Sequence, residues 1–279
     1  MILGLFARTF PRPAVEQVFD AVAAHGVSSL QFNFACAGLP SLPESLEPGL
    51  LERIRRAAGE RGLSLAAVSG TFNMIHPDPA QRQDGLRRLD VVAGACAALG
   101  TQVVTLCTGT RAPEDMWRHH PDNDTPEAWH DLLHSLTSAL QIAERHQVFL
   151  GIEPEITNVV SSAAHARRLL DELRAPRLKI VLDAANLFQP ATLPRMKDVL
   201  EEAFELLGEH LALVHGKELA ATGHASQQAL GSGVLDWTHY LTLLRRAQFR
   251  GSLILHGFEE KDAAQSLSFV RGALTRAGH

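Results

Sequence analysis

Cysteine is scarce in this chain of 279 residues, with only three copies, Cys36, Cys96 and Cys107. They are odd in number, widely spaced and form no CxxC pair, so a disulfide framework is not expected. This usage is typical of reduced thiols in a cytoplasmic protein. Neither a helix terminus nor a fixed base is evident beside Cys107, which favours a small buried residue over a nucleophile.

The chain also lacks an excess of positive charge and any long apolar run. Its formal net charge is −5 with histidine neutral, which offers no broad attraction to nucleic acid or to an acidic membrane. No apolar stretch approaches the roughly 20 residues that cross a bilayer. The first residues, MILGLFARTF, lack the basic region and the long apolar stretch of a signal peptide. We therefore expect a soluble cytoplasmic protein with neither a nucleic-acid nor a membrane partner.

Hydrophobic residues, in contrast, make up 46% of the chain, and many fall into short runs separated by amphipathic helical patterns. The runs expected to form buried strands are 2–6, 29–34, 63–69, 102–107, 148–153, 178–183, 211–215 and 252–256. The helices expected between them are 13–25, 50–61, 80–99, 125–146, 162–174, 194–208, 236–247 and 261–277.

This alternation predicts a parallel sheet with right-handed crossover connections. Eight strand–helix units in 279 residues give roughly 35 residues a unit, which is typical of a closed (β/α)8 TIM barrel. An open doubly wound sheet is the alternative, but no glycine-rich phosphate fingerprint follows the first strand. No linker or low-complexity segment is evident, so we expect residues 1–279 to form a single domain.

Four of the strand-like runs stop at a side chain that can bind a metal. FLGIE ends at Glu153, KIVLD at Asp183, LALVH at His215 and SLILH at His256. Taken singly, each has an ordinary explanation: a salt-bridged acid, a turn cap or a buried histidine that satisfies a hydrogen bond. Together they share one register, and the same ends of successive parallel strands converge in a barrel. The pattern therefore predicts a metal site.

Other polar residues gather in the loops on the same expected face, above all in the long segments 70–79 and 108–124. The candidates for substrate binding are His76, Arg111, Trp117, His120, Glu155, Asn186 and Lys217, with His119, Asn123, Asn158 and Glu218 close by in sequence. An arginine could clamp a carboxylate, a phosphate or a polyol, and Trp117 could cover the apolar face of a sugar. The alternative is a loop that is ordered by its own hydrogen bonds.

Several motifs resemble those of the xylose isomerase-like TIM-barrel family of sugar phosphate isomerases and epimerases. They are IEPE at 152–155, VLDAANLF at 181–188, LVHGKE at 213–218, ALGSGVLDW at 229–237 and GFEE at 257–260. The resemblance covers nearly the whole chain and is strongest from about residue 148 to 260. The family includes monomers, dimers and tetramers, which leaves a homo-oligomer open.

In the epimerase branch of that family, a metal is held by Glu, Asp, His and a second Glu. The resemblance implies Glu153, Asp183 and His215 for the first three. The fourth position falls on His256, while Glu259 and Glu260 follow three and four residues later. In the family the two glutamates also form the acid–base pair on opposite faces of an enediolate. With two imidazoles in the set, Mn²⁺, Zn²⁺, Fe²⁺ or Co²⁺ would suit the site better than Mg²⁺.

The leading hypothesis is a metal-dependent isomerase or epimerase of a small sugar or hydroxy-carbonyl compound. Glu153 would be ligand and base, and His256, Glu259 or His76 the complementary proton carrier. A metal-dependent dehydratase or lyase of a polyol or keto-sugar is the second hypothesis, and a non-catalytic sugar-binding barrel is the third. The family's endonuclease branch expects histidines where this chain has Cys107 and Asn186, which argues against DNA repair.

Overall fold

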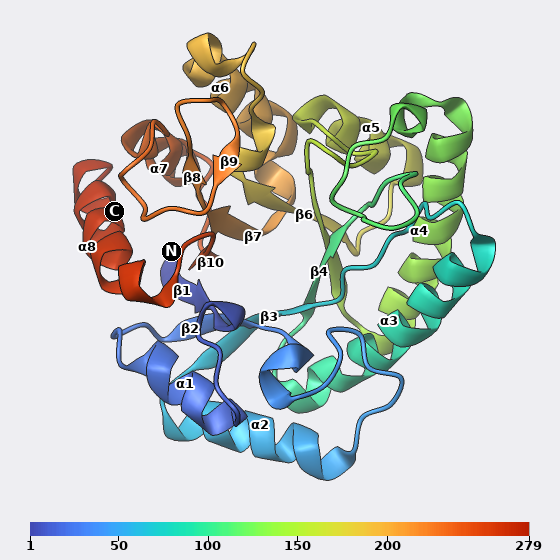
Figure 1. Cartoon of the computed structure of the whole chain (residues 1–279), viewed down its shortest axis with the longest axis horizontal. Helices are drawn as coiled ribbons and strands as arrows, with labels where there is room; N and C mark the ends of the chain where they lie inside the picture. The colour runs from blue at the N-terminus through green and yellow to red at the C-terminus, as the bar shows by residue number, and fades with distance from the viewer. Residues whose placement is uncertain (279) are drawn as a thin grey trace.

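The strands of this protein close into a barrel, as the alternating pattern predicted. The computed structural model describes residues 1–278. Its barrel strands are β1 (Ile2–Phe6), β2 (Ser29–Phe32), β3 (Ser64–Ser69), β4 (Val103–Cys107), β5 (Phe149–Glu153), β6 (Leu178–Asp183), β7 (Leu211–Gly216) and β10 (Ser252–Leu255). They pair in parallel in the closed order β1-β10-β7-β6-β5-β4-β3-β2, so the first and last strands are neighbours (Figure 1).

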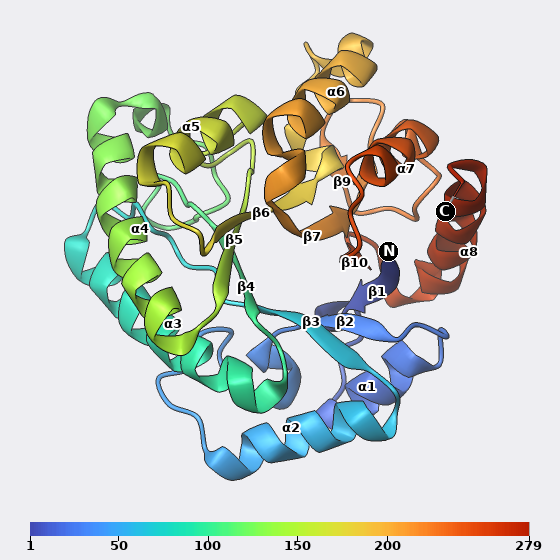
Figure 2. The same cartoon turned by 180° about the vertical axis from the view of Figure 1, so that it is seen from behind.

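A helix follows each barrel strand, and the helices form an outer ring that both views show (Figures 1 and 2). They are α1 (Val15–Ala23), α2 (Pro48–Glu60), α3 (Pro79–Leu99), α4 (Pro126–His146), α5 (Ala163–Leu173), α6 (Met196–Leu207), α7 (Trp237–Arg246) and α8 (Ala263–Arg276). The predicted (β/α)8 barrel is therefore confirmed. Within residues 1–278, none of these helices is both long and apolar enough to cross a membrane.

Helix starts follow the local sequence. α4 begins after Thr125, whose hydroxyl accepts a hydrogen bond from Ala128 N, and Pro126 occupies the first turn, where no donor is missed. α3 begins in the same way after Asp78, whose carboxylate accepts from Ala80 N. The predicted helix ends differ from those in the structure by at most two positions, which is the usual uncertainty where terminal turns fray.

The barrel interior has its own small apolar layer. Val181, Leu213 and Ile254, with Ala67 of β3, form a cluster separate from the larger core between the strands and the helices. Gly151 completes the layer on β5, since a Cβ there would lie 2.7 Å from Val181 Cγ2. Side chains two residues apart on a strand point to the same face. The residues two positions after this layer therefore point into the barrel at its C-terminal end.

One connection departs from the prediction. Between β7 and α7 the chain forms a small antiparallel hairpin, β8 (Glu218–Leu219) and β9 (Ala225–Ser226). The carboxylate of Glu218 is fully buried and accepts hydrogen bonds from the backbone N–H groups of Leu219 and Leu235 and from Trp237 Nε1. Glu218 therefore organises this loop instead of facing a substrate.

Candidate functional site

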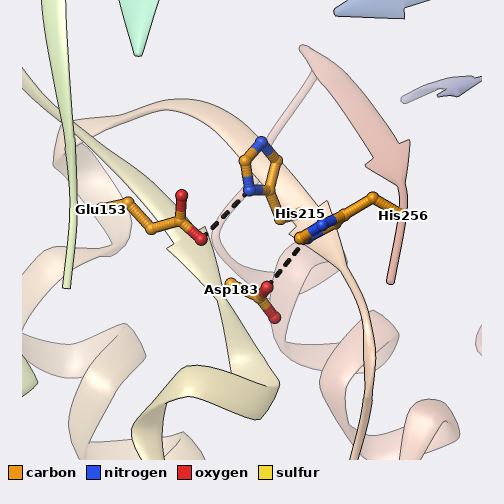
Figure 3. A group of neighbouring side chains, drawn as sticks. All are labelled: Glu153, Asp183, His215 and His256. Atoms are coloured by element: carbon orange, nitrogen blue, oxygen red, sulfur yellow. Dashed lines mark hydrogen bonds and ion pairs between the residues drawn. The ribbon is translucent and has the colours of Figure 1, made fainter. Parts of the chain in front are cut away.

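Four metal-capable side chains meet at the C-terminal mouth of the barrel. Glu153 ends β5, Asp183 ends β6, His215 lies near the end of β7, and His256 directly follows β10. Each stands two residues beyond the apolar layer, so all four point inward (Figure 3). Each offers one ligand atom, and these four atoms lie within 4.8 Å of one another.

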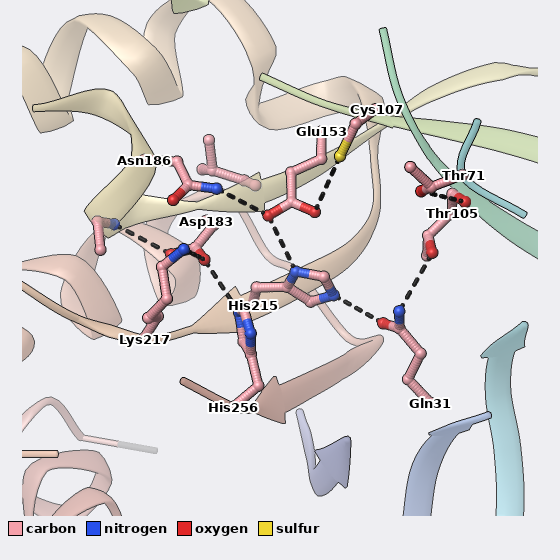
Figure 4. Close-up of polar contacts among 12 residues, drawn as sticks. Gln31, Thr71, Thr105, Cys107, Glu153, Asp183, Asn186, His215, Lys217 and His256 are labelled. Atoms are coloured by element: carbon pink, nitrogen blue, oxygen red, sulfur yellow. Dashed lines mark hydrogen bonds and ion pairs between the residues drawn. The ribbon is translucent and has the colours of Figure 1, made fainter. Parts of the chain in front are cut away.

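The imidazole of His215 has a defined orientation because Gln31 of β2 holds it (Figure 4). Gln31 Nε2 donates to Ser69 Oγ at 3.0 Å and to Thr105 Oγ1 at 3.1 Å, which leaves its Oε1 facing His215 Nε2 at 2.7 Å. His215 Nε2 must therefore carry a proton, and Nδ1 faces the cluster, 3.2 Å from Glu153 Oε1.

Charge stabilises the ionised form of Glu153. Burial raises the pKa of this carboxyl, but the adjacent His215 imidazole outweighs burial and brings the pKa below its ordinary value. The same contact raises the pKa of His215 against the effect of its own burial. Asn186 Nδ2 donates to Glu153 Oε1 at 3.0 Å, and Cys107 Sγ lies 3.9 Å from Oε2. Glu153 is thus held as a carboxylate of fixed orientation.

Asp183 is the second buried carboxylate of the cluster. Its Oδ1 accepts from Ala185 N at 3.1 Å, and its Oδ2 lies 3.0 Å from His256 Nε2 and 3.7 Å from Lys217 Nζ. Burial raises the pKa of Asp183, but the combined effect of Lys217 and His256 is larger and brings the pKa below its ordinary value. The carboxyl therefore remains ionised. The pKa of His256 is lowered, chiefly by burial, which favours a neutral imidazole that can act as a ligand or proton carrier.

A cavity of about 340 Å³ opens above the cluster. Of the residues predicted to bind substrate, Trp117, Glu155, Asn186 and Lys217 line it. Burial raises the pKa of Glu155 to about 7, while that of Lys217 is raised by the surrounding carboxylates in spite of burial. Asn186 is 3% exposed, and its Oδ1 has no hydrogen-bond partner among residues 1–278. A buried acceptor without a partner at a cavity wall is suited to a ligand hydroxyl.

The other predicted site residues do not reach the cavity. Arg111 forms an ion pair with Asp131 at 2.7 Å and donates to Ile75 O at 3.0 Å, so it joins the loops after β3 and β4. His76 Nε2 lies 3.0 Å from Pro113 O in the same pair of loops. His120 Nδ1 accepts from Asp122 N at 3.2 Å and so orders its own turn.

Glu259 is exposed and pairs with Lys261 at 2.7 Å, away from the cluster. His256 is therefore the residue of the last strand that reaches the other three side chains. The backbone explains this placement. His256 N still donates to Gly216 O, which extends the strand alignment by one residue, and Gly257 then turns the chain away with a φ of +73°.

Several cavity residues were missed in the sequence. Gln31, Ser69 and Thr105 line the cavity from β2, β3 and β4, and Arg8 and Asn33 line it from the segments after β1 and β2. Gln31 is 4% exposed and lies between Leu30 and Phe32 in β2. A polar amide in the run SLQFNF was the available signal, because a buried amide must have hydrogen-bond partners.

The donor set fits a divalent transition metal. Two ligand atoms bound at about 2.0–2.2 Å from one ion are at most about 4.4 Å apart. The 4.8 Å spread of the four atoms therefore requires only small side-chain movements. Asn186 hydrogen-bonds to Glu153, and Gln31 hydrogen-bonds to His215. Hydrogen bonds of this type fix the orientation of metal-binding side chains in other proteins.

Comparison with known proteins gives relatives with the same architecture. A curated Haemophilus influenzae protein that carries the name of an L-ribulose-5-phosphate 3-epimerase, SgbU, is 20% identical over 199 residues. The match covers 70% of this chain but only 65% of that protein, less than two thirds of its length.

Solved structures match over nearly the full chain. The 3-keto-D-glucoside 4-epimerase YcjR from E. coli has a TM-score of 0.76 at 18% identity and covers 98% of this chain and 99% of its own. A D-psicose 3-epimerase from Clostridium cellulolyticum H10, solved with D-tagatose, has a TM-score of 0.74 at 16% identity, with the same coverage. At these identities the likeness establishes the fold. The model of the xylose isomerase-like TIM barrel family matches residues 19–273, and the chain therefore belongs to that family.

Proposed function

We propose that this chain is a metal-dependent epimerase or isomerase of a small sugar or a related hydroxy-carbonyl compound. The observation that carries the proposal is the convergence of Glu153, Asp183, His215 and His256 beneath a polar cavity. The names of the relatives support it, since each names a sugar epimerase. We also predict that residues 1–279 act as one cytoplasmic domain.

The four side chains would hold the ion through two carboxylates and two imidazoles. This mixed set suits Mn²⁺, Fe²⁺, Co²⁺ or Zn²⁺ better than Mg²⁺, which prefers oxygen ligands. A divalent ion at this point would supply positive charge that stabilises the negative charge developing on the substrate oxygens.

Glu153 is the proposed base for the first proton transfer. It is ionised, oriented by Asn186 and placed at the base of the cavity. A carboxylate in that position can remove a proton from the carbon next to a substrate carbonyl. Asn186 Oδ1 would accept a hydrogen bond from a substrate hydroxyl, and the Lys217 ammonium would donate one to a substrate oxygen.

Return of the proton requires a second group, and His256 is the proposed carrier. It stands where the family's second glutamate is expected, lines the cavity and lies 3.0 Å from Asp183. A neutral imidazole at this position can accept or donate a proton near neutral pH. The chain would therefore pair a carboxylate with an imidazole instead of using two carboxylates.

The proposal is tested by supplying the metal and following hydrogen exchange. Purified protein is treated with chelator, reloaded with Mn²⁺, Co²⁺ or Mg²⁺, and incubated with a panel of ketoses in D₂O. We expect Mn²⁺ and Co²⁺ to raise the melting temperature more than Mg²⁺, and NMR to show deuterium entering one ketose as its epimer or isomer forms. Protein that neither binds these ions nor is stabilised by them would refute the proposal.

A dehydratase is the second candidate, and the replacement of the second glutamate by His256 is the observation that favours it. Loss of water from a polyol or keto-sugar requires one base, for which Glu153 suffices, together with an acid for the departing hydroxyl. The same NMR experiment separates the two reactions. Solvent deuterium in a product of unchanged formula indicates epimerisation or isomerisation, whereas a product lighter by one water indicates dehydration.

Removing the amide of Gln31 is expected to weaken metal binding. Gln31→Met retains the side-chain length but leaves His215 Nε2 without its acceptor, so the orientation of the ring is lost. We expect the Kd for Mn²⁺, measured by calorimetry, to rise about 10- to 100-fold, as is usual for residues behind a metal ligand. Gln102→Met, a change at an exposed position, is the matched control. Unchanged affinity in Gln31→Met would contradict the role assigned to Gln31.

A further inference from the structure

The cavity has one wall with a cation and no acid. Arg8, which follows β1, lines the cavity and is exposed. Within residues 1–278, its guanidinium has neither an ion pair nor a hydrogen bond, whereas most arginines of the protein are paired with acids on the outer helices. The acids that line the cavity, Glu153 and Glu155, both come from the end of β5. Arg8 therefore has no acidic partner among the residues that the structure describes.

Two further hydrogen-bonding groups lie on the same wall. Asn33, which follows β2, uses its Oδ1 to accept from Ala35 N at 2.9 Å, and its Nδ2 has no partner among the described residues. Ser41, further along the same connection, is half-buried and likewise makes no hydrogen bond within residues 1–278. Both line the cavity. A guanidinium, an amide N–H₂ and a hydroxyl thus face one space, and all three can donate.

This wall lies across the barrel from the two carboxylates of the candidate metal centre, Glu153 and Asp183. In the closed strand order, β1 and β5 are four strands apart, as are β2 and β6. Strands separated by four places in an eight-stranded barrel lie on opposite sides. Arg8 therefore faces the β5 side that carries Glu153, and Asn33 faces the β6 side that carries Asp183. A molecule with its reacting carbons at Glu153 would extend its other end toward Arg8.

We propose that the substrate carries an anionic substituent, a phosphate or a carboxylate, at the end remote from its reacting carbons, and that Arg8 binds it with help from Asn33 and Ser41. This inference rests on the proposed function, because that function places the reacting carbons at Glu153. Arginine presents two parallel N–H groups that match the oxygens of a phosphate or carboxylate. The substrate class is therefore a sugar phosphate or a sugar acid, not a neutral sugar.

The charge of the site agrees with an anion. A divalent ion together with Lys217 and Arg8 supplies four positive charges. Glu153, Asp183 and Glu155, all counted as ionised, supply three negative charges. A neutral sugar would leave this enclosed site with a net positive charge, whereas an anionic group would offset it at Arg8. Arg8 is exposed, so the attraction between its charge and an anionic group is weakened by water, and the affinity comes from the direct contact together with the neutralisation.

The test compares three ligands and two variants of the Mn²⁺-loaded protein. The ligands are a ketopentose 5-phosphate, the same ketopentose without phosphate, and the corresponding sugar acid. Their Kd values are measured by calorimetry, and turnover is followed by deuterium exchange. Arg8→Gln removes the guanidinium. Arg55→Gln is the matched control, because Arg55 is an exposed arginine of α2 that does not line the cavity.

We expect at least one anionic ligand to bind about 10- to 100-fold more tightly than the neutral ketopentose, the range for a charged hydrogen-bonded contact. Arg8→Gln should abolish this preference for an anionic ligand, and Arg55→Gln should retain it. Tighter binding of the ketopentose 5-phosphate would identify the anionic group as a phosphate, and tighter binding of the sugar acid would identify it as a carboxylate. Equal binding of all three ligands, or a preference that survives in Arg8→Gln, overturns the inference even if the neutral sugar is epimerised. Selective anion binding without any exchange would refute the epimerase and keep the anion site.

Discussion

Glu153→Gln is expected to lower kcat by at least about 10³-fold, the largest effect of any substitution in this protein. The change removes the proposed base and one ligand charge together, whereas glutamine retains the size of the side chain and its contact with Asn186. General bases alone contribute about 10² to 10⁴ in rate. The measurement is the rate of deuterium incorporation into the ketose that the wild-type protein turns over, at saturating Mn²⁺.

Glu259→Gln is the matched control for this experiment. Glu259 lies three residues after His256, is exposed and pairs with Lys261 outside the cavity. Its loss should leave the rate within about twofold of wild type, because surface ion pairs contribute little. A large loss of rate in Glu259→Gln with a small one in Glu153→Gln would overturn the proposed assignment and place the second carboxylate of the family at Glu259.

Asp183→Asn is expected to have the second-largest effect, on metal affinity and on stability. Asparagine can still accept from Ala185 N, so the turn after β6 is retained. It lacks the charge that faces Lys217 and His256, however, and Lys217 is then left as a buried cation with less compensation. Breaking a buried ion pair costs about 3–5 kcal/mol. We expect a rise of at least about 100-fold in the Kd for Mn²⁺ and a lower free energy of unfolding.

Calorimetry with Mn²⁺ and urea denaturation of the chelator-treated protein measure these two quantities separately. Asp198→Asn is the control, since Asp198 is an exposed acid of α6 that pairs with Arg195 on the surface. It should change neither quantity by more than the scatter usual for surface positions. Asp183→Asn with wild-type Mn²⁺ affinity would show that the four side chains do not act as one metal centre.

The strand ends show how far sequence reasoning could go. A strand places every second side chain on one face, so the runs that end at Glu153, Asp183, His215 and His256 predicted both the barrel and the meeting of these residues. The interior layer of Val181, Leu213 and Ile254, two residues earlier, agrees with that register. The choice between His256 and Glu259 was open in the sequence because it depends on where the chain leaves the last strand.

The loops show where sequence reasoning stopped. Arg111 and His76 have the chemistry of substrate ligands, yet both join the loops after β3 and β4 to each other. Arg8 and Gln31 were not among the predicted site residues, yet both line the cavity. A loop side chain has no periodicity that determines its direction, and its partner comes from a segment far away in the chain.

The sequence by itself therefore determined the barrel, the order of its elements and the four side chains at its mouth. These follow from local patterns: alternation along strands, periodicity along helices and caps at their ends. The tertiary structure alone decided that His256 and not Glu259 joins the cluster, and that Gln31 sets the tautomer of His215. It also decided that Arg8 lines the cavity without a partner in residues 1–278. Those outcomes depend on distances between segments that only the closed barrel brings together.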